Sequence, residues 1–99
     1  MVVVGGTVLV KPESIKAAVE LGLWMTSETR VETGCITYGF HISLNDPNVI
    51  QVFEEWESME DLSLHLATAH YIKFIEEIGP MLAQAPDVKI YDIASVRPL

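Results

Sequence analysis

The chain has 99 residues, 14 of them acidic and 6 basic, so its formal net charge is −8. Hydrophobic residues make up 49% of it, which excludes intrinsic disorder and is typical of a single globular domain, here residues 1–99. The segment 31–72 holds seven carboxylates and no Lys or Arg, so we expect neither nucleic acid nor an anionic membrane surface as a partner.

The apolar content does not indicate a membrane protein or an exported one. No run approaches the roughly 20 apolar residues that a membrane-spanning helix needs. The apolar start of the chain carries neither the basic region nor the cleavage site of a signal peptide. The lone cysteine, Cys35, excludes an intramolecular disulfide. We therefore expect a cytoplasmic protein.

Hydrophobic periodicity and turn chemistry predict seven elements. Gly34 is expected to end the first helix, and Ser58 and Thr68 are expected to cap two consecutive helices. In chain order we expect a strand at 2–10, a helix at 12–31, a hairpin of strands at 36–44 and 49–57, helices at 58–67 and from 68 to the Gly-Pro at 79–80, and a strand at 88–96.

This order predicts an α+β, ferredoxin-like β-α-β-β-α-β fold, with one antiparallel sheet and the helices on one face. The first strand is apolar on both faces, and Phe53 points away from the face that carries Trp56. A large apolar sheet face without helices is typical of an interaction surface. We therefore expect a homodimer in which two sheets pack face to face, although a few exposed valines would also explain the pattern.

The first candidate for chemistry is Glu54, which shares a strand face with Trp56 and with the apolar Ile50 and Val52. A carboxylate that points into an apolar layer is costly unless it is paired or protonated. Glu54 is therefore either a carboxyl group with a raised pKa that handles protons or a group that orients a neighbour. Tyr38 and Phe40 share a face of the preceding strand and are candidates to line a flat pocket together with Trp56.

The second candidate is the pair His65 and His70. On one continuous helix a spacing of five residues would separate them by about 140°, but a break near Thr68 would let both face the same place. His70 would then lie at a helix N-terminus, which favours the neutral imidazole suited to proton transfer. Capping or packing roles are equally open. The spacing is not that of HExxH, so we expect no metal site.

The segment FEEWESMEDLSLHLATAHYIKFIEEI resembles the antibiotic biosynthesis monooxygenase family, small dimeric α+β barrels that include quinol monooxygenases. The family's Glu, Trp, His and Thr-Pro-His motif corresponds in this chain to Glu54, Trp56, His65, Thr68 and His70, with Ala69 in place of Pro. The segment RVETGCITYGFHISLNDPN is similar to the family's Glu-Pro-Gly-Cys segment and hairpin, with Thr33 in place of Pro.

The resemblance implies an oxygenase without flavin, haem or metal, in which a flat quinol or anthrone is deprotonated and its anion reduces dioxygen. It implies that His65, His70 and Glu54 handle protons, while Trp56, Tyr38 and Phe40 bind the ring. Haem-degrading relatives use an Asn on the first strand, where this chain has Gly5, Gly6 and Thr7. Two alternatives stay open. One is a binding module for a hydrophobic small molecule, and the other is an isomerase that resembles autoinducer-processing enzymes of this fold.

Overall fold

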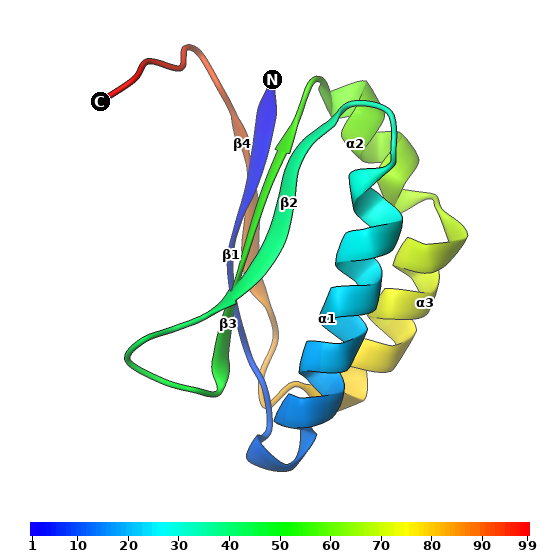
Figure 1. Cartoon of the computed structure of the whole chain (residues 1–99), viewed down its shortest axis with the longest axis vertical. Helices are drawn as coiled ribbons and strands as arrows, with labels where there is room; N and C mark the ends of the chain where they lie inside the picture. Colours follow the sequence, from blue (N-terminus) through cyan, green and yellow to red (C-terminus); the bar gives the residue numbers. More distant parts are fainter.

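A computed structural model describes all 99 residues and has an α+β architecture of two layers (Figure 1). The four strands form one antiparallel sheet in the order β2-β3-β1-β4, and the α-helices cover one of its faces. This confirms the expected ferredoxin-like fold. The elements are β1 (Val2–Leu9), the 3-10 turn η1 (Pro12–Ser14), α1 (Ile15–Arg30), β2 (Cys35–Ile42), β3 (Val49–Trp56), α2 (Met59–Leu66), α3 (Ala69–Ile78), the 3-10 turn η2 (Gly79–Met81) and β4 (Asp87–Asp92).

Ser58 and Thr68 cap α2 and α3 as expected, whereas α1 ends at Arg30, with Val31 as its C-cap, before Gly34 is reached. Gly34 has φ 84°, a left-handed conformation that glycine adopts without strain, and it leads the chain from α1 into β2. The Ser58 hydroxyl accepts a hydrogen bond from the Asp61 amide at 3.1 Å. The Thr68 hydroxyl accepts one from the Tyr71 amide at 3.2 Å. Each satisfies a free N–H in a first helical turn, so the break between α2 and α3 is confirmed.

The last strand is shorter than expected. We predicted a strand at 88–96, but β4 ends at Asp92, which pairs with Val2 at the beginning of β1. One further hydrogen bond joins the Ile93 amide to the Met1 carbonyl oxygen. The length of β4 is therefore that of its pairing with β1, and not that of the apolar pattern of the segment.

The core lies between the sheet and the helices. On β3 the buried positions alternate as a pleated strand requires, and Ile50, Val52, Glu54 and Trp56 face the helices. Around Trp56 and Tyr38 the buried side chains form one cluster, which includes Val2, Val4, Met25 and Leu62. The helix-facing side of β3 therefore combines apolar residues with one carboxylate, as the sequence predicted.

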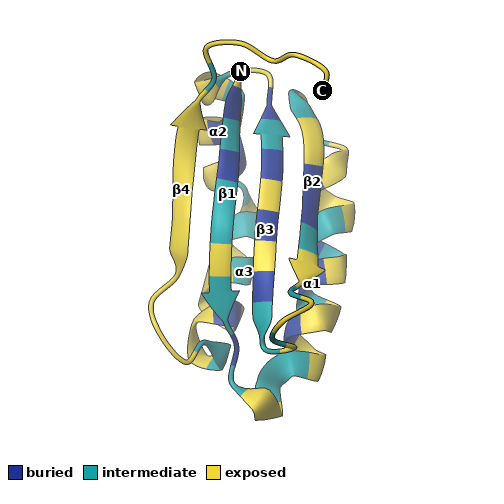
Figure 2. Cartoon of the chain, turned by 90° about the vertical axis from the view of Figure 1, so that its left-hand side faces the viewer, coloured by how far each residue is buried: buried dark blue, intermediate teal, exposed yellow.

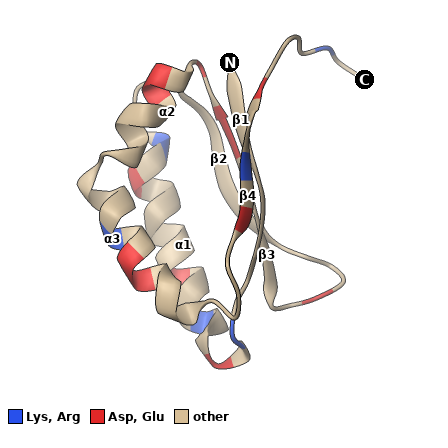
Figure 3. Cartoon of the chain, turned by 180° about the vertical axis from the view of Figure 1, so that it is seen from behind, with Lys and Arg blue, Asp and Glu red and all other residues tan.

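The opposite face of the sheet has no helix over it, and we call it the outer face (Figure 2). Phe53 and Tyr91 are exposed there, and Val3 lies between their strands and is partly exposed. Acidic side chains lie on several elements, whereas basic ones are few and scattered (Figure 3). No helix combines the length and the apolar character that crossing a bilayer requires.

Candidate functional site

A cavity of about 480 Å³ lies between the sheet and the helices. Most of the residues that line it are apolar, and an aromatic row forms part of its wall. In that row Phe40 meets Tyr38 edge-on, with ring centroids 5.4 Å apart, and stacks on Phe74 at 5.6 Å. Glu54 is the only carboxylate in the lining. The cavity therefore suits an apolar, flat molecule that presents one polar group to Glu54.

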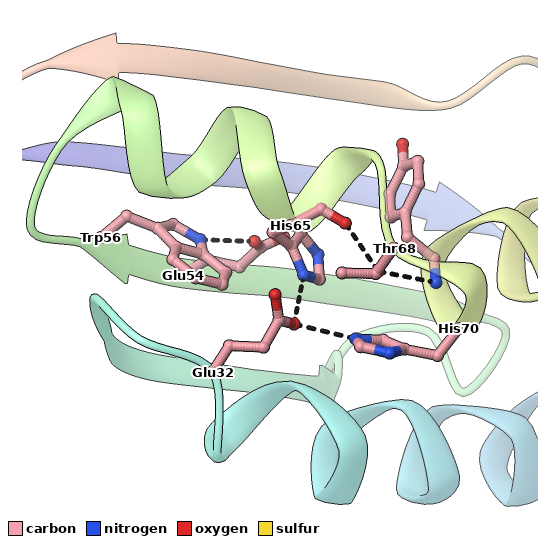
Figure 4. Close-up of polar contacts among 7 residues, drawn as sticks. Glu32, Glu54, Trp56, His65, Thr68 and His70 are labelled. Carbon is pink, nitrogen blue, oxygen red and sulfur yellow. Dashed lines mark hydrogen bonds and ion pairs between the residues drawn. The ribbon is translucent and has the colours of Figure 1, made fainter.

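Glu54 is buried, and its Oε1 accepts a hydrogen bond from the Trp56 indole N–H at 2.9 Å (Figure 4). Burial raises the pKa of Glu54 to about 7, and the negative charge of Glu32 adds to this effect. The bond from Trp56 opposes the shift because it favours the carboxylate. Glu54 can therefore gain or lose a proton near neutral pH, as a general acid or base requires.

Two phenols accompany Glu54 in the cavity lining, those of Tyr38 and Tyr71. Burial raises the pKa of both groups, and the charge of Glu54 adds to each shift. Both phenols therefore stay protonated at neutral pH and keep an O–H to donate. Tyr71 and Phe74 were not among the candidates from the sequence, because periodicity alone does not separate a residue that lines a cavity from one that fills a core.

His65 and His70 converge on one carboxylate oxygen, that of Glu32 (Figure 4). His65 Nδ1 lies 2.7 Å from Glu32 Oε2, and His70 Nε2 lies 2.8 Å from the same atom. An ionised carboxylate only accepts hydrogen bonds, so each histidine donates from the nitrogen that faces it. The break at Thr68 brings the two rings together, with centroids 5.9 Å apart.

Glu32 was not among the residues singled out from the sequence. It follows α1, 33 residues before His65 and 38 before His70, so no local spacing connects it to them. The only sequence feature that points to Glu32 is the Glu-Thr-Gly-Cys segment at 32–35, which is similar to the family's Glu-Pro-Gly-Cys segment. That similarity alone assigns no role to the glutamate.

The structure separates the expected site residues into two groups. Tyr38, Phe40 and Glu54 line the cavity, whereas Trp56, His65 and His70 do not. Trp56 is fully buried beside the cavity and packs against His65 with ring centroids 4.8 Å apart. Burial lowers the pKa of His65 and the bond to Glu32 opposes the shift. Trp56 thus contacts both Glu54 and His65. Glu32, His65 and His70 form a group that we call the histidine cluster.

The raised pKa of Glu54 predicts a stability that depends on pH. A carboxyl group whose pKa rises from 4.5 to about 7 on folding binds its proton more tightly in the folded state. Its contribution to the free energy of unfolding is fully present below pH 4.5 and is lost as the pH rises towards 7, by up to about 3 kcal/mol.

The substitution Glu54→Gln removes this titration and keeps an oxygen that accepts the Trp56 bond. Urea unfolding at pH 5 and at pH 8 should therefore show a smaller loss of stability at pH 8 in the variant than in the unsubstituted chain. Glu55→Gln, at the adjacent position of the same strand, is the matched control. It should leave the loss of stability between pH 5 and pH 8 as it is in the unsubstituted chain. An equal pH dependence of the Glu54→Gln variant would contradict the raised pKa.

Comparisons with known proteins agree with this architecture. The model of the family named antibiotic biosynthesis monooxygenase matches residues 1–77. The uncharacterised protein sll1783 of Synechocystis sp. is 32% identical over 98 residues, which are 99% of this chain and 67% of the relative. A conserved protein from Methanosarcina mazei Go1 is 28% identical, with a TM-score of 0.88, over 91% of this chain and 89% of that one. The crystal structure of an antibiotic biosynthesis monooxygenase is 27% identical, with a TM-score of 0.89, over 96% of this chain and all of that one. The chain therefore belongs to the antibiotic biosynthesis monooxygenase family.

Proposed function

We propose that the protein is a cofactor-independent monooxygenase that oxidises a quinol, an anthrone or a similar flat aromatic with dioxygen. Membership of the family supports this class of reaction. The observation that carries the proposal is Glu54, a buried carboxyl group with a pKa of about 7 and the sole carboxylate on an apolar, aromatic-walled cavity.

In the proposed reaction the Glu54 carboxylate removes a proton from the substrate. For an anthrone, the anion donates one electron pair to form a carbon–oxygen bond with dioxygen, and protonation gives a hydroperoxide. The same carbon then loses its second proton, and the electron pair of that C–H bond forms the carbonyl bond as the O–O bond breaks. One oxygen atom enters the substrate and the other leaves as water, so no separate reductant is consumed. The protonated phenols of Tyr38 and Tyr71 line the same cavity and are available to donate hydrogen bonds to the anion.

The positions of the other candidates refine their roles in this proposal. Phe40 and Tyr38 flank the substrate ring, whereas Trp56 holds Glu54 by its indole bond rather than forming the wall. His65 and His70 do not line the cavity. We therefore assign the base to Glu54 and not to either histidine.

The cavity disfavours the isomerase alternative, whose substrate is phosphorylated. It has no arginine in its lining, and its one lysine, Lys89, is paired with Asp87 at 2.7 Å. Apart from His41, a phosphate group would find no unpaired basic side chain there. A binding module for an apolar molecule remains the competing function, because an apolar cavity binds such ligands without any chemistry.

Oxygen uptake with reduced naphthoquinols and anthrones, measured in EDTA-treated buffer, separates these functions. We expect uptake above the autoxidation rate, and Glu54→Gln should lower kcat by about 10²–10⁴-fold because the base is lost. His70→Ala should change kcat by less than about twofold, since a contact outside the reacting groups adds little to the barrier.

Two outcomes of these measurements would contradict parts of the proposal. Ligand binding without any uptake would contradict the oxygenase proposal and favour the binding module. An unchanged kcat in Glu54→Gln, together with a large loss in His70→Ala, would move the base to the histidine cluster.

We further propose that the outer face packs against the same face of a second copy of the chain. Phe53 and Tyr91 are large apolar side chains exposed on this face, and β4 is an edge strand exposed along its length. Burying aromatic side chains of this size is a strong driving force for association. Glu55 on the same face is bonded to Thr37 at 2.6 Å, so its carboxylate is already partnered.

Light scattering coupled to gel filtration tests this dimer. At micromolar concentration we expect twice the chain mass, and Phe53→Glu should weaken association by about tenfold or more because it places a charge in the interface. Leu64→Glu is the matched control, since Leu64 is also an exposed apolar side chain but lies on α2, away from the outer face. A monomer in the unsubstituted chain would contradict the proposal.

A further inference from the structure

We propose that Glu32, His65 and His70 form a binding site for one divalent transition-metal ion, with Zn²⁺ as the best match. Glu32 Oε2, His65 Nδ1 and His70 Nε2 lie within 4.8 Å of one another. None of the three residues lines the cavity, so this site lies beside the cavity and not in it. The proposal departs from the expectation drawn from the missing HExxH spacing, because the three ligands come from three different parts of the chain.

The distances among the three atoms are close to those that a bound ion imposes. Zinc lies about 2.0–2.2 Å from imidazole nitrogen and carboxylate oxygen, so two ligand atoms of one ion are separated by up to about 4 Å. The histidine nitrogens are already 2.7 and 2.8 Å from the Glu32 oxygen. Binding therefore needs side-chain movements of less than about 1 Å. The ion would replace the two protons that the histidines now share with the carboxylate.

The fold holds the two histidines in place before any ion binds. The Thr68 hydroxyl donates to the His65 carbonyl oxygen at 2.7 Å and also caps α3, on which His70 is the second residue. The ring of His65 packs against the rings of Trp56 and Tyr71 at 4.8 and 5.3 Å. The two histidine side chains therefore lose most of their conformational entropy on folding and little more when an ion binds, which favours tight binding.

The surroundings leave the site open on one side. His65 is 1% exposed, whereas the side chains of Glu32 and His70 are 16% and 18% exposed. An ion can therefore arrive from solvent, and a water molecule can complete four-coordination. The nearest basic residue in sequence, Arg30, is directed elsewhere and donates to the Tyr38 carbonyl oxygen at 3.0 Å.

The donor set selects the class of ion. Two imidazoles and one carboxylate suit zinc and its neighbours in the first transition row, whereas Mg²⁺ and Ca²⁺ prefer all-oxygen sites. Such an ion would connect the chain after α1 to α2 and α3, and any ligand that binds only the folded state raises its stability.

Calorimetric titration of the EDTA-stripped full chain with Zn²⁺, in the absence of substrate, tests the site. We expect one ion per chain, a Kd of about 1 μM or below, and a raised Tm. Co²⁺ should give the intense visible absorption of a four- or five-coordinate centre. Glu32→Gln and His70→Ala should each weaken binding by about tenfold or more.

His41→Ala is the matched control, since His41 is exposed on β2 and lies outside the histidine cluster, and it should bind as the unsubstituted chain does. Circular dichroism verifies that the Glu32→Gln and His70→Ala variants are folded. We expect His70→Ala to disturb the fold less, because the His70 side chain is partly exposed. No stoichiometric binding by the unsubstituted chain would overturn the proposal and leave a purely hydrogen-bonded cluster. Binding that survives both substitutions would also overturn it. Neither outcome bears on the oxygenase proposal, because no turnover is measured.

Discussion

The position of Glu54 on the helix-facing side of β3 is the constraint from which the rest of the site follows. A strand alternates its side chains, so Glu54 cannot leave the interior without also turning out Ile50, Val52 and Trp56. The indole N–H of Trp56 needs a buried acceptor, and the Glu54 carboxyl group supplies it at 2.9 Å. The fold therefore keeps a titratable group in an apolar layer, where desolvation raises its pKa to about 7.

The polar interior has two neighbouring parts with different chemistry. On one side Glu54 and two protonated phenols belong to the lining of an apolar cavity. On the other side the histidine cluster collects around the Glu32 carboxylate, which is partly exposed. The indole ring of Trp56 contacts both, through its bond to Glu54 and its packing on His65. One part is suited to moving a proton in an apolar site, and for the other we propose the binding of an ion near solvent.

The strand periodicity and the caps were sufficient to predict the fold and the burial of Glu54, because both depend on local sequence. The break at Thr68 could also be predicted, and with it the approach of His65 and His70. Glu32 could not, because its contact with them is made only when the distant end of α1 packs beside α2 and α3. For the same reason the aromatic pattern did not reveal that Trp56 lies behind the cavity wall while Phe74 forms part of it.

The central claim is that Glu54 is a carboxyl group poised near neutrality at the cavity. A carbon-13 NMR titration of the chain labelled at glutamate side-chain carboxyl groups, with Glu54→Gln to assign the resonance, measures this directly. The account predicts that the Glu54 resonance titrates near pH 7, well above the ordinary pKa of a glutamate side chain. A midpoint near 4.5 would show that Glu54 stays ionised at neutral pH, and it would contradict the account.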